Sequence, residues 1–168
     1  MQILETERLL LRHLQAGDLD DLHRLYADPE VRRYFPEGTL SREETREELE
    51  YFIDGYTRQP QMGLWATVDK ASGRFIGRCG LLSWNIDQRP EIEVAYMLAR
   101  DCWGRGLGTE AARGILQFGF DSLGLSRLIC LIDADNLASI RVATNIGMSF
   151  EKAGRDDKGP YHLYARNR

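Results

Sequence analysis

The fold is decided by two stretches, Glu91-Ile92-Glu93-Val94-Ala95-Tyr96-Met97-Leu98 and, a few residues later, Trp103-Gly104-Arg105-Gly106-Leu107-Gly108-Thr109-Glu110. They predict a β-strand, a glycine-rich turn and a helix. Backbone N–H groups at such a helix start have no side-chain cover, and the positive end of the helix dipole points the same way. Because this arrangement binds phosphate or pyrophosphate, we expect a phosphate-bearing ligand at the loop.

The strand before the loop carries two carboxylates, Glu91 and Glu93, which share one face by the period of two. The other face is the predicted core face and holds Ile92, Val94, Tyr96 and Leu98. Glutamates in an apolar strand upstream of a phosphate loop suggest a general base in a cleft. They are equally compatible with two ordinary solvent-facing residues, and the pattern alone leaves both explanations open.

The rest of the chain predicts further strands and helices around this unit. The predicted strands cover residues 8–14, 64–69, 74–84, 127–133, 150–154 and 161–165. Four helices are predicted. The first begins at an Asp18 N-cap, and the second begins at the Ser41–Glu44 capping box and is closed by Pro60. The third runs from Thr109 to residue 123, and the fourth begins at Ser139 and ends before Gly147. Residues 31–38 predict a short helix and loop, and residues 85–90 a loop. This order predicts a mixed α/β sheet with helices on both faces.

Length and composition favour one globular domain over residues 1–168, since 43% of the residues are hydrophobic and 29% are charged. A net charge of −4 gives no basic surface for nucleic acid, and no apolar run is long enough to span a membrane. The three cysteines are well separated and no His/Cys cluster exists, so we expect neither disulfides nor a metal. Without a signal-peptide pattern at the N-terminus, the predicted location is cytoplasmic.

Two motifs have competing explanations. A Rossmann dinucleotide site also uses a strand, a glycine-rich turn and a helix, and Asp133 and Asp135 lie roughly where its acidic residue belongs. The loop lies past mid-chain behind apparently antiparallel strands, however, and a plain connection with flexible glycines is a further alternative. Asn136 and Ser139 either cap the following helix or face a ligand.

Three blocks, in order and at consistent spacing, resemble the GNAT superfamily of acyl-CoA N-acyltransferases, and within it the RimJ/RimL type of ribosomal-protein N-terminal acetyltransferase. The blocks are residues 5–12 (Glu-Thr-Glu-Arg-Leu-Leu-Leu-Arg), residues 93–111 with the glycine loop, and residues 136–148. The resemblance covers nearly the whole chain. It implies the GNAT fold, an α/β fold with a central, largely antiparallel sheet and helices on both faces.

The resemblance also implies a role for each matched residue. Glu93 matches the strand glutamate that takes the amine proton, and Met97 and Leu98 match the strand end whose backbone pairs with the pantetheine arm. The loop that would hold the coenzyme A pyrophosphate consists of Trp103, Gly104, Arg105, Gly106, Leu107, Gly108 and Thr109. Asn136 and Ser139 match positions near the thioester and the departing thiol. Many relatives have a tyrosine as general acid where this chain has Ala143, so Ser139 or a bound water is the predicted acid.

The predicted activity is therefore an acetyl-CoA-dependent N-acetyltransferase in which a primary amine attacks directly in a ternary complex. A protein N-terminus, a lysine, a polyamine and an aminoglycoside-like drug are all candidate acceptors, and the choice is expected to depend on the early helices and on loops near Tyr34, Trp84 and Asp156. A homodimer is possible. Two other functions are alternatives to this activity: a coenzyme A-binding regulatory module without turnover, and a nucleotide-dependent oxidoreductase.

Overall fold

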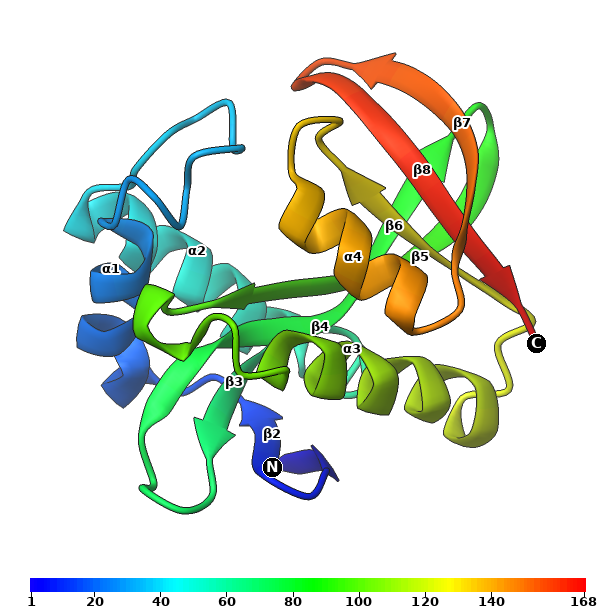
Figure 1. The fold of residues 1–168 in the computed structure, drawn as a ribbon. Coiled ribbons are helices and arrows are strands. Elements are labelled where there is room, and N and C mark those ends of the chain that lie inside the picture. The colour runs from blue at the N-terminus through cyan, green and yellow to red at the C-terminus, as the bar shows by residue number, and fades with distance from the viewer.

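The computed structural model describes residues 1–168 and folds around one sheet of eight strands (Figure 1). The strands are β1 Gln2–Glu5, β2 Leu9–His13, β3 Gly63–Asp69, β4 Phe75–Ile86, β5 Arg89–Leu98, β6 Arg127–Ile132, β7 Ser149–Asp156 and β8 Gly159–Asn167. The helices are α1 Leu19–Tyr26, α2 Arg42–Gly55, α3 Leu107–Gln117 and α4 Leu137–Asn145. The spatial order of the strands is β1-β2-β3-β4-β5-β6-β8-β7.

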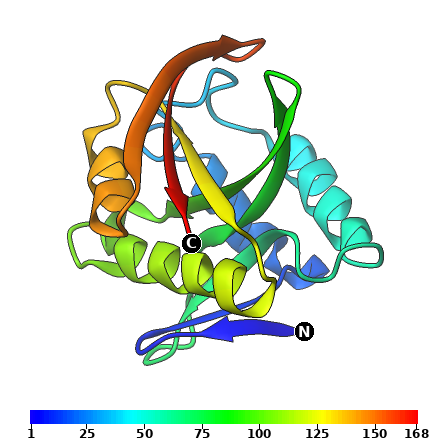
Figure 2. The same ribbon diagram turned by 90° about the vertical axis from the view of Figure 1, so that its right-hand side faces the viewer.

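All neighbouring strands are antiparallel except β5 and β6, which run parallel and share a single register pair, Glu93 with Ile129. Beyond that pair the two strands separate, so the β6 side of residues 94–98 is not paired with a strand. Figure 2 shows the sheet strongly twisted, with β6 and the β7–β8 hairpin turned away from the first strands. The predicted mixed, largely antiparallel sheet is confirmed, and its one opening lies at the strand that carries Glu93.

Helices cover both faces of the sheet, as predicted. α1 and α2 pack together on β4 and β3, whereas α3 lies on β5 and β4, and α4 on α3 and β6 (Figure 1). The two faces of β5 show the division. Leu98 points toward α3, while Met97 pairs with Arg78 of β4, whose side chain reaches Tyr26 of α1. β5 is therefore covered on both faces, by α3 on one and by side chains such as Arg78 of β4 on the other.

This enclosure corrects the prediction that only one face of β5 belongs to the core. Glu91 is 6% exposed, and Ala95 and Met97 on the same face are also buried. Glu91 is therefore buried and Glu93 half-buried with a hydrogen bond from Trp84, so neither is an ordinary solvent-facing residue. Burial on both faces is typical of a strand with helices above and below it, and it leaves little of the alternation seen in half-exposed strands.

Several predicted boundaries were wrong. Residues 31–38 form turns and contain no helix, and β1 was not predicted. The predicted loop over residues 85–90 is a two-residue hairpin turn, in which Asp87 and Gln88 have φ of 51° and 63°. Such turns usually carry asparagine or glycine, so this sequence gave no signal for one.

The helix ends differ from the predictions for local reasons. The Asp18 side chain accepts hydrogen bonds from Gln15 N and Arg12 and does not cap α1. The Ser41–Glu44 capping box is confirmed, but α2 ends at Gly55, well before Pro60. α3 begins at Leu107 and passes into a π-helical turn over Phe118–Ser122. α4 begins at Leu137, because its N-cap is Asn136. None of these helices is long and apolar enough to cross a membrane.

Candidate active site

The glycine loop leads from β5 into the N-terminus of α3. Gly104 and Gly106 have φ of 72° and 76°, a region that glycine adopts without strain, and Gly106 is the N-cap of α3. No side chain caps this terminus. The first N–H groups of the helix are therefore left to an outside acceptor, and the positive end of the helix dipole favours an anion there.

Arg8 adds a positive charge beside this loop, a role that the sequence pattern did not predict. Its Nη1 donates to Arg105 O over 3.0 Å, and its Nε donates to Glu110 Oε2 over 2.6 Å. Burial raises the pKa of Glu110, but hydrogen bonds from Thr6 and Arg8 outweigh it and hold the pKa below its ordinary value. An ionised Glu110 thus fixes Arg8 next to the loop. Arg8 lies in residues 5–12, the first of the three sequence blocks that resemble the family, and this position was the one sequence feature that pointed to a role for it.

Trp103 links the loop to the end of β5 by a hydrogen bond. Its indole Nε1 donates to Leu98 O over 2.9 Å, while the ring stays about half exposed. Met97 and Leu98 are both buried at the separation of β5 and β6. Their backbone therefore lies where an extended ligand chain can enter the sheet, although one lone pair of the Leu98 carbonyl oxygen is already used by Trp103.

Glu93 lies where β5 and β6 begin to part. Its Oε2 accepts a hydrogen bond from Trp84 Nε1 over 2.6 Å, and Oε1 lies 3.4 Å from Leu131 N. Burial raises the pKa of Glu93 to about 7, against the lowering effect of these hydrogen bonds and of the charges on Arg78 and Lys158. A carboxyl group with a pKa near neutrality is well matched to general-base catalysis. Trp84, expected only as part of an acceptor loop, is thus a direct partner of Glu93.

Asn136 and Ser139 lie at the start of α4, on the other side of the opening. Asn136 Oδ1 accepts from Ser139 N over 3.1 Å, so Asn136 is the helix cap. The Ser139 hydroxyl has no hydrogen-bond partner in the protein, and Ser139 O accepts from the Tyr96 hydroxyl over 2.9 Å. Burial raises the pKa of Tyr96 well above its ordinary value, so this phenol retains its proton and fixes α4 against β5. Ala143 is fully buried and offers no acid.

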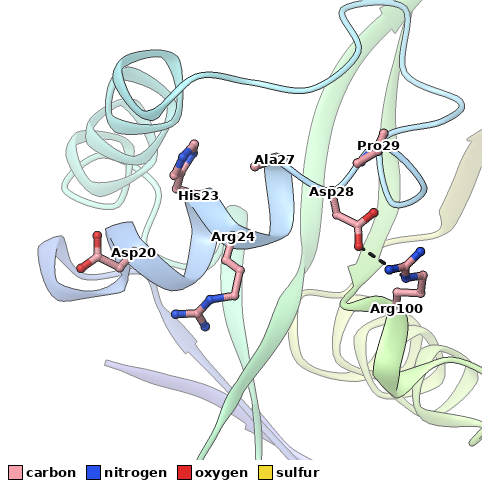
Figure 3. Close-up of a pocket in the computed structure, with 7 residues that line it drawn as sticks. All are labelled: Asp20, His23, Arg24, Ala27, Asp28, Pro29 and Arg100. Carbon is pink, nitrogen blue, oxygen red and sulfur yellow. Dashed lines mark ion pairs between the residues drawn. The ribbon is translucent and has the colours of Figure 1, made fainter.

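A separate surface hollow of about 560 Å³ lies near the end of α1 (Figure 3). It is lined by Asp20, His23, Arg24, Ala27, Asp28, Pro29 and Arg100. Asp28 and Arg100 point toward each other across it, with 3.6 Å between Oδ2 and Nε. The hollow contains none of the predicted site residues, and no group of three or more His, Cys, Asp and Glu side chains in the chain is arranged to hold a metal ion.

Comparison with known proteins gives a consistent result. A family model described as an acetyltransferase (GNAT) domain matches residues 8–149. The uncharacterized protein YkkB of Bacillus subtilis is 36% identical over 97% of this chain and 94% of its own length. The uncharacterized N-acetyltransferase p20 of Bacillus licheniformis is 31% identical over 92% of this chain and 85% of its own. A GNAT-family acetyltransferase structure from Bacillus anthracis superposes with a TM-score of 0.84 at 23% identity, covering 99% of this chain and 98% of that one.

More distant matches differ in their acceptors. Spermidine N(1)-acetyltransferase of Escherichia coli is 27% identical over 84% of this chain and 73% of its own length. RimL, a ribosomal L7/L12 alpha-N-protein acetyltransferase solved with coenzyme A, superposes with a TM-score of 0.82 at 18% identity, covering 99% of this chain and 98% of that one. The predicted superfamily is therefore confirmed, whereas the RimJ/RimL branch within it stays a prediction. The nucleotide-dependent oxidoreductase is contradicted by the family match.

Proposed function

Because the chain belongs to the GNAT acetyltransferase family and is thus an acyltransferase, we propose that it transfers an acetyl group from acetyl-CoA to a primary amine, as one N-acetyltransferase domain over residues 1–168. One observation carries the proposal. Glu93, a half-buried carboxyl group with a pKa raised to about 7, lies where β5 and β6 part, and β5 leads directly to the uncapped start of α3. A base and an anion site thus lie on one continuous unit.

The chemistry assigned to Glu93 is removal of a proton from the acceptor. Amines reach the site mostly protonated, since an α-amino group has a pKa of about 8 and lysine about 10.4. Once Glu93 has taken one proton, the amine nitrogen attacks the thioester carbonyl in a ternary complex. The new C–N bond forms and the C–S bond breaks, so the electron pair leaves with the thiolate. The bonded nitrogen must still lose a second proton, which the thiolate takes up. We assign the relay of that proton to the Ser139 hydroxyl or to a water bound there, so that the relaying group ends with the proton it began with.

The loop and its neighbours would hold the co-substrate. Backbone N–H groups at the start of α3 suit the pyrophosphate, and Arg8 Nη2, 3.6 Å from the position of a Cβ at Gly106, adds a charged donor beside them. The unpaired β6 side of residues 94–98 suits an extended pantetheine arm. Backbone donors near Met97 would then polarise the thioester carbonyl.

The proposed acceptor is a primary amine of one of two kinds. A protein N-terminus, as in the RimJ/RimL type, and a small-molecule amine both fit an amine-binding site next to Glu93. The regulatory alternative, a coenzyme A-binding module without turnover, is favoured only by Ala143, which stands where many relatives carry a tyrosine.

A thiol-release screen tests the proposed function. Purified protein is incubated with acetyl-CoA and a panel of peptides, amino acids, polyamines and aminoglycosides, and each acetylated product is identified by mass. Release that depends on both the amine and the protein supports the proposal. Tight acetyl-CoA binding with no release for any amine would favour the regulatory module.

A further inference from the structure

Two arginine side chains are buried on the Glu93 side of the sheet. Arg32, in the α1–α2 connection, is 4% exposed, and Arg78, in β4, is 6% exposed. Both guanidinium groups lie against the same two aromatic rings. Arg32 Cζ is 4.4 Å from the Phe35 centroid and 5.3 Å from that of Tyr26, and Arg78 Cζ is 5.8 Å and 5.7 Å from them. These cation–π contacts offset part of the cost of burying two like charges.

Arg78 has little of its hydrogen-bonding capacity satisfied. Its Nε donates to the Tyr26 hydroxyl over 3.0 Å, and that hydroxyl donates to Glu48. Neither Nη of Arg78 has a hydrogen bond or an ion pair in the protein. The only wholly buried side-chain polar atoms without a partner are Trp65 Nε1 and Thr67 Oγ1, so both Nη groups of Arg78 border space that solvent can reach. A buried guanidinium with two free, accessible donors calls for an outside acceptor.

Arg32 is only partly neutralised. Its Nε donates to Gly38 O over 2.6 Å, and its Nη2 lies 3.7 Å from Glu37 Oε2. Glu37 is shared, because its Oε1 lies 3.3 Å from Lys158 Nζ in the β7–β8 turn. Desolvation and the charge on Arg78 both lower the pKa of Arg32. The α1–α2 connection and the β7–β8 turn therefore meet at a shared carboxylate, beside two buried arginines.

The two buried arginines lie on the same side of the sheet as the proposed base. Arg78 pairs with Met97 and Leu82 with Glu93, so Arg78 and Glu93 project from the same face of the sheet. The cations Arg32, Arg78 and Lys158 face three carboxylates besides Glu93, namely Glu37, Glu44 and Glu48. An acceptor amine placed at Glu93 would have its other end near Arg78.

We propose that Arg78, supported by Arg32, binds a carboxylate of the acceptor, so that the acceptor is an amine that carries an acid group and not a polyamine. This inference rests on the proposed acetyl transfer. The two free Nη donors of a guanidinium match the two oxygens of a carboxylate. A polyamine would instead bring a second cation against two buried arginines, which is unfavourable in a desolvated site.

The test compares amines that differ only in the carboxylate. Leucine and isopentylamine form one pair, a peptide with an N-terminal Asp and the same peptide with Asn form a second, and spermidine is a separate arm. For wild type, kcat/KM of the acid member of at least one pair should exceed that of its partner by about ten- to hundredfold. The pair that shows this preference tells whether the carboxylate belongs to a free amino acid or to a peptide side chain.

Variants then assign the preference to Arg78. Arg78→Gln should reduce the ratio to about one, and Arg78→Lys should keep part of it. Arg24→Gln, an exposed arginine of α1, is the control and should leave the ratio unchanged. A purely structural role would lower both members of a pair equally. Equal kcat/KM within both pairs for wild type, a preference for spermidine, or an unchanged ratio in Arg78→Gln would each overturn the proposal.

Binding separates this proposal from the proposed activity. Calorimetry of leucine and the Asp peptide against protein saturated with coenzyme A needs no turnover. Affinity that is lost in Arg78→Gln, together with no thiol release from any amine, would reject acetyl transfer and keep the anion site. Thiol release together with equal affinity for both members of each pair would keep the activity and reject the anion site.

Discussion

Burial of Glu93 opposes the charge of its carboxyl group more than the hydrogen bonds and nearby cations favour that charge. Burial raises its pKa from the ordinary value of 4.5 to about 7, so the folded protein binds a proton that the unfolded chain has already lost in this pH range. The stability that comes from the protonated form is complete below about pH 4.5 and is lost as the pH rises through about 7. A residue that costs stability at neutral pH is typical of a functional site.

Glu93→Gln should therefore change how the unfolding free energy depends on pH. Glutamine keeps the shape and can accept from Trp84 but carries no charge. Between pH 6 and pH 8.5 the wild type should lose about 1 kcal/mol more unfolding free energy than the variant. Denaturant unfolding of both proteins at the two pH values measures this difference. Parallel curves for the two proteins would show that Glu93 titrates near its ordinary value.

The sequence left open whether Asn136 and Ser139 cap α4 or face the ligand; in the structure Asn136 is the cap, and the Ser139 hydroxyl is free to act on the ligand. Asn136 is the cap of α4, so Asn136→Ala should lower the unfolding free energy by about 1 kcal/mol. The Ser139 hydroxyl has no partner in the protein, so Ser139→Ala should leave stability within about 0.5 kcal/mol of wild type and yet lower kcat. Unfolding curves and kcat on both variants check this. An unchanged kcat in Ser139→Ala would transfer the acid role to water.

At the scale of elements, binding of acetyl-CoA to the loop between β5 and α3 can be tested at Gly108. Gly108 has ordinary backbone geometry, and a Cβ there would lie 3.7 Å from Val142 Cγ2, a normal contact. Gly108→Ala should therefore fold. Gly108→Glu puts a negative charge at the start of α3, where the pyrophosphate would bind, and should abolish acetyl-CoA binding. Calorimetry on the two variants tests this, and full affinity in Gly108→Glu would remove the loop from the site.

The same unit shows what sequence can predict. Alternating glycines before a helix are a local signal, so the loop and the candidate base on its strand were found from the residues alone. Neither the Trp84 bond to Glu93 nor the position of Arg78 on the same face was predicted, because both depend on the β4–β5 register. That register follows from the turn at Asp87 and Gln88, which carries no glycine, and a shift by one residue would reverse the faces.

At the scale of the whole molecule, ligand binding should stabilise the fold in a specific way. A ligand at about 100 times its Kd adds about 2.7 kcal/mol, which for a chain of this size raises Tm by roughly 5–10 °C. Acetyl-CoA should produce this shift and NAD should produce none. Thermal unfolding with each ligand measures it. A shift with NAD alone would contradict the placement of coenzyme A at the α3 terminus.

Long-range contacts account for most of what the sequence left unresolved. Arg8 reaches the glycine loop through Glu110, and Glu37 reaches Lys158 between the α1–α2 connection and the β7–β8 turn. Glu91 is held by Arg127 of β6, with 3.0 Å between Oε2 and Nε, and that arginine also pairs with Glu151 of β7. Each pair joins residues far apart in the chain, and periodicity carries no information about such contacts.

The central claim, that Glu93 takes the acceptor proton, is tested most directly by the pH dependence of kcat/KM. A peptide α-amine accepted in the screen serves as acceptor, and Glu91→Gln, which removes a buried but ion-paired glutamate of the same strand, is the control. We predict that Glu93→Gln lowers kcat/KM at pH 7 by about 10²- to 10⁴-fold, since that is the usual contribution of a general base. The loss should shrink toward high pH, where the amine is already neutral, and should exceed that in Glu91→Gln. Equal kcat/KM for wild type and Glu93→Gln across neutral pH would contradict the claim.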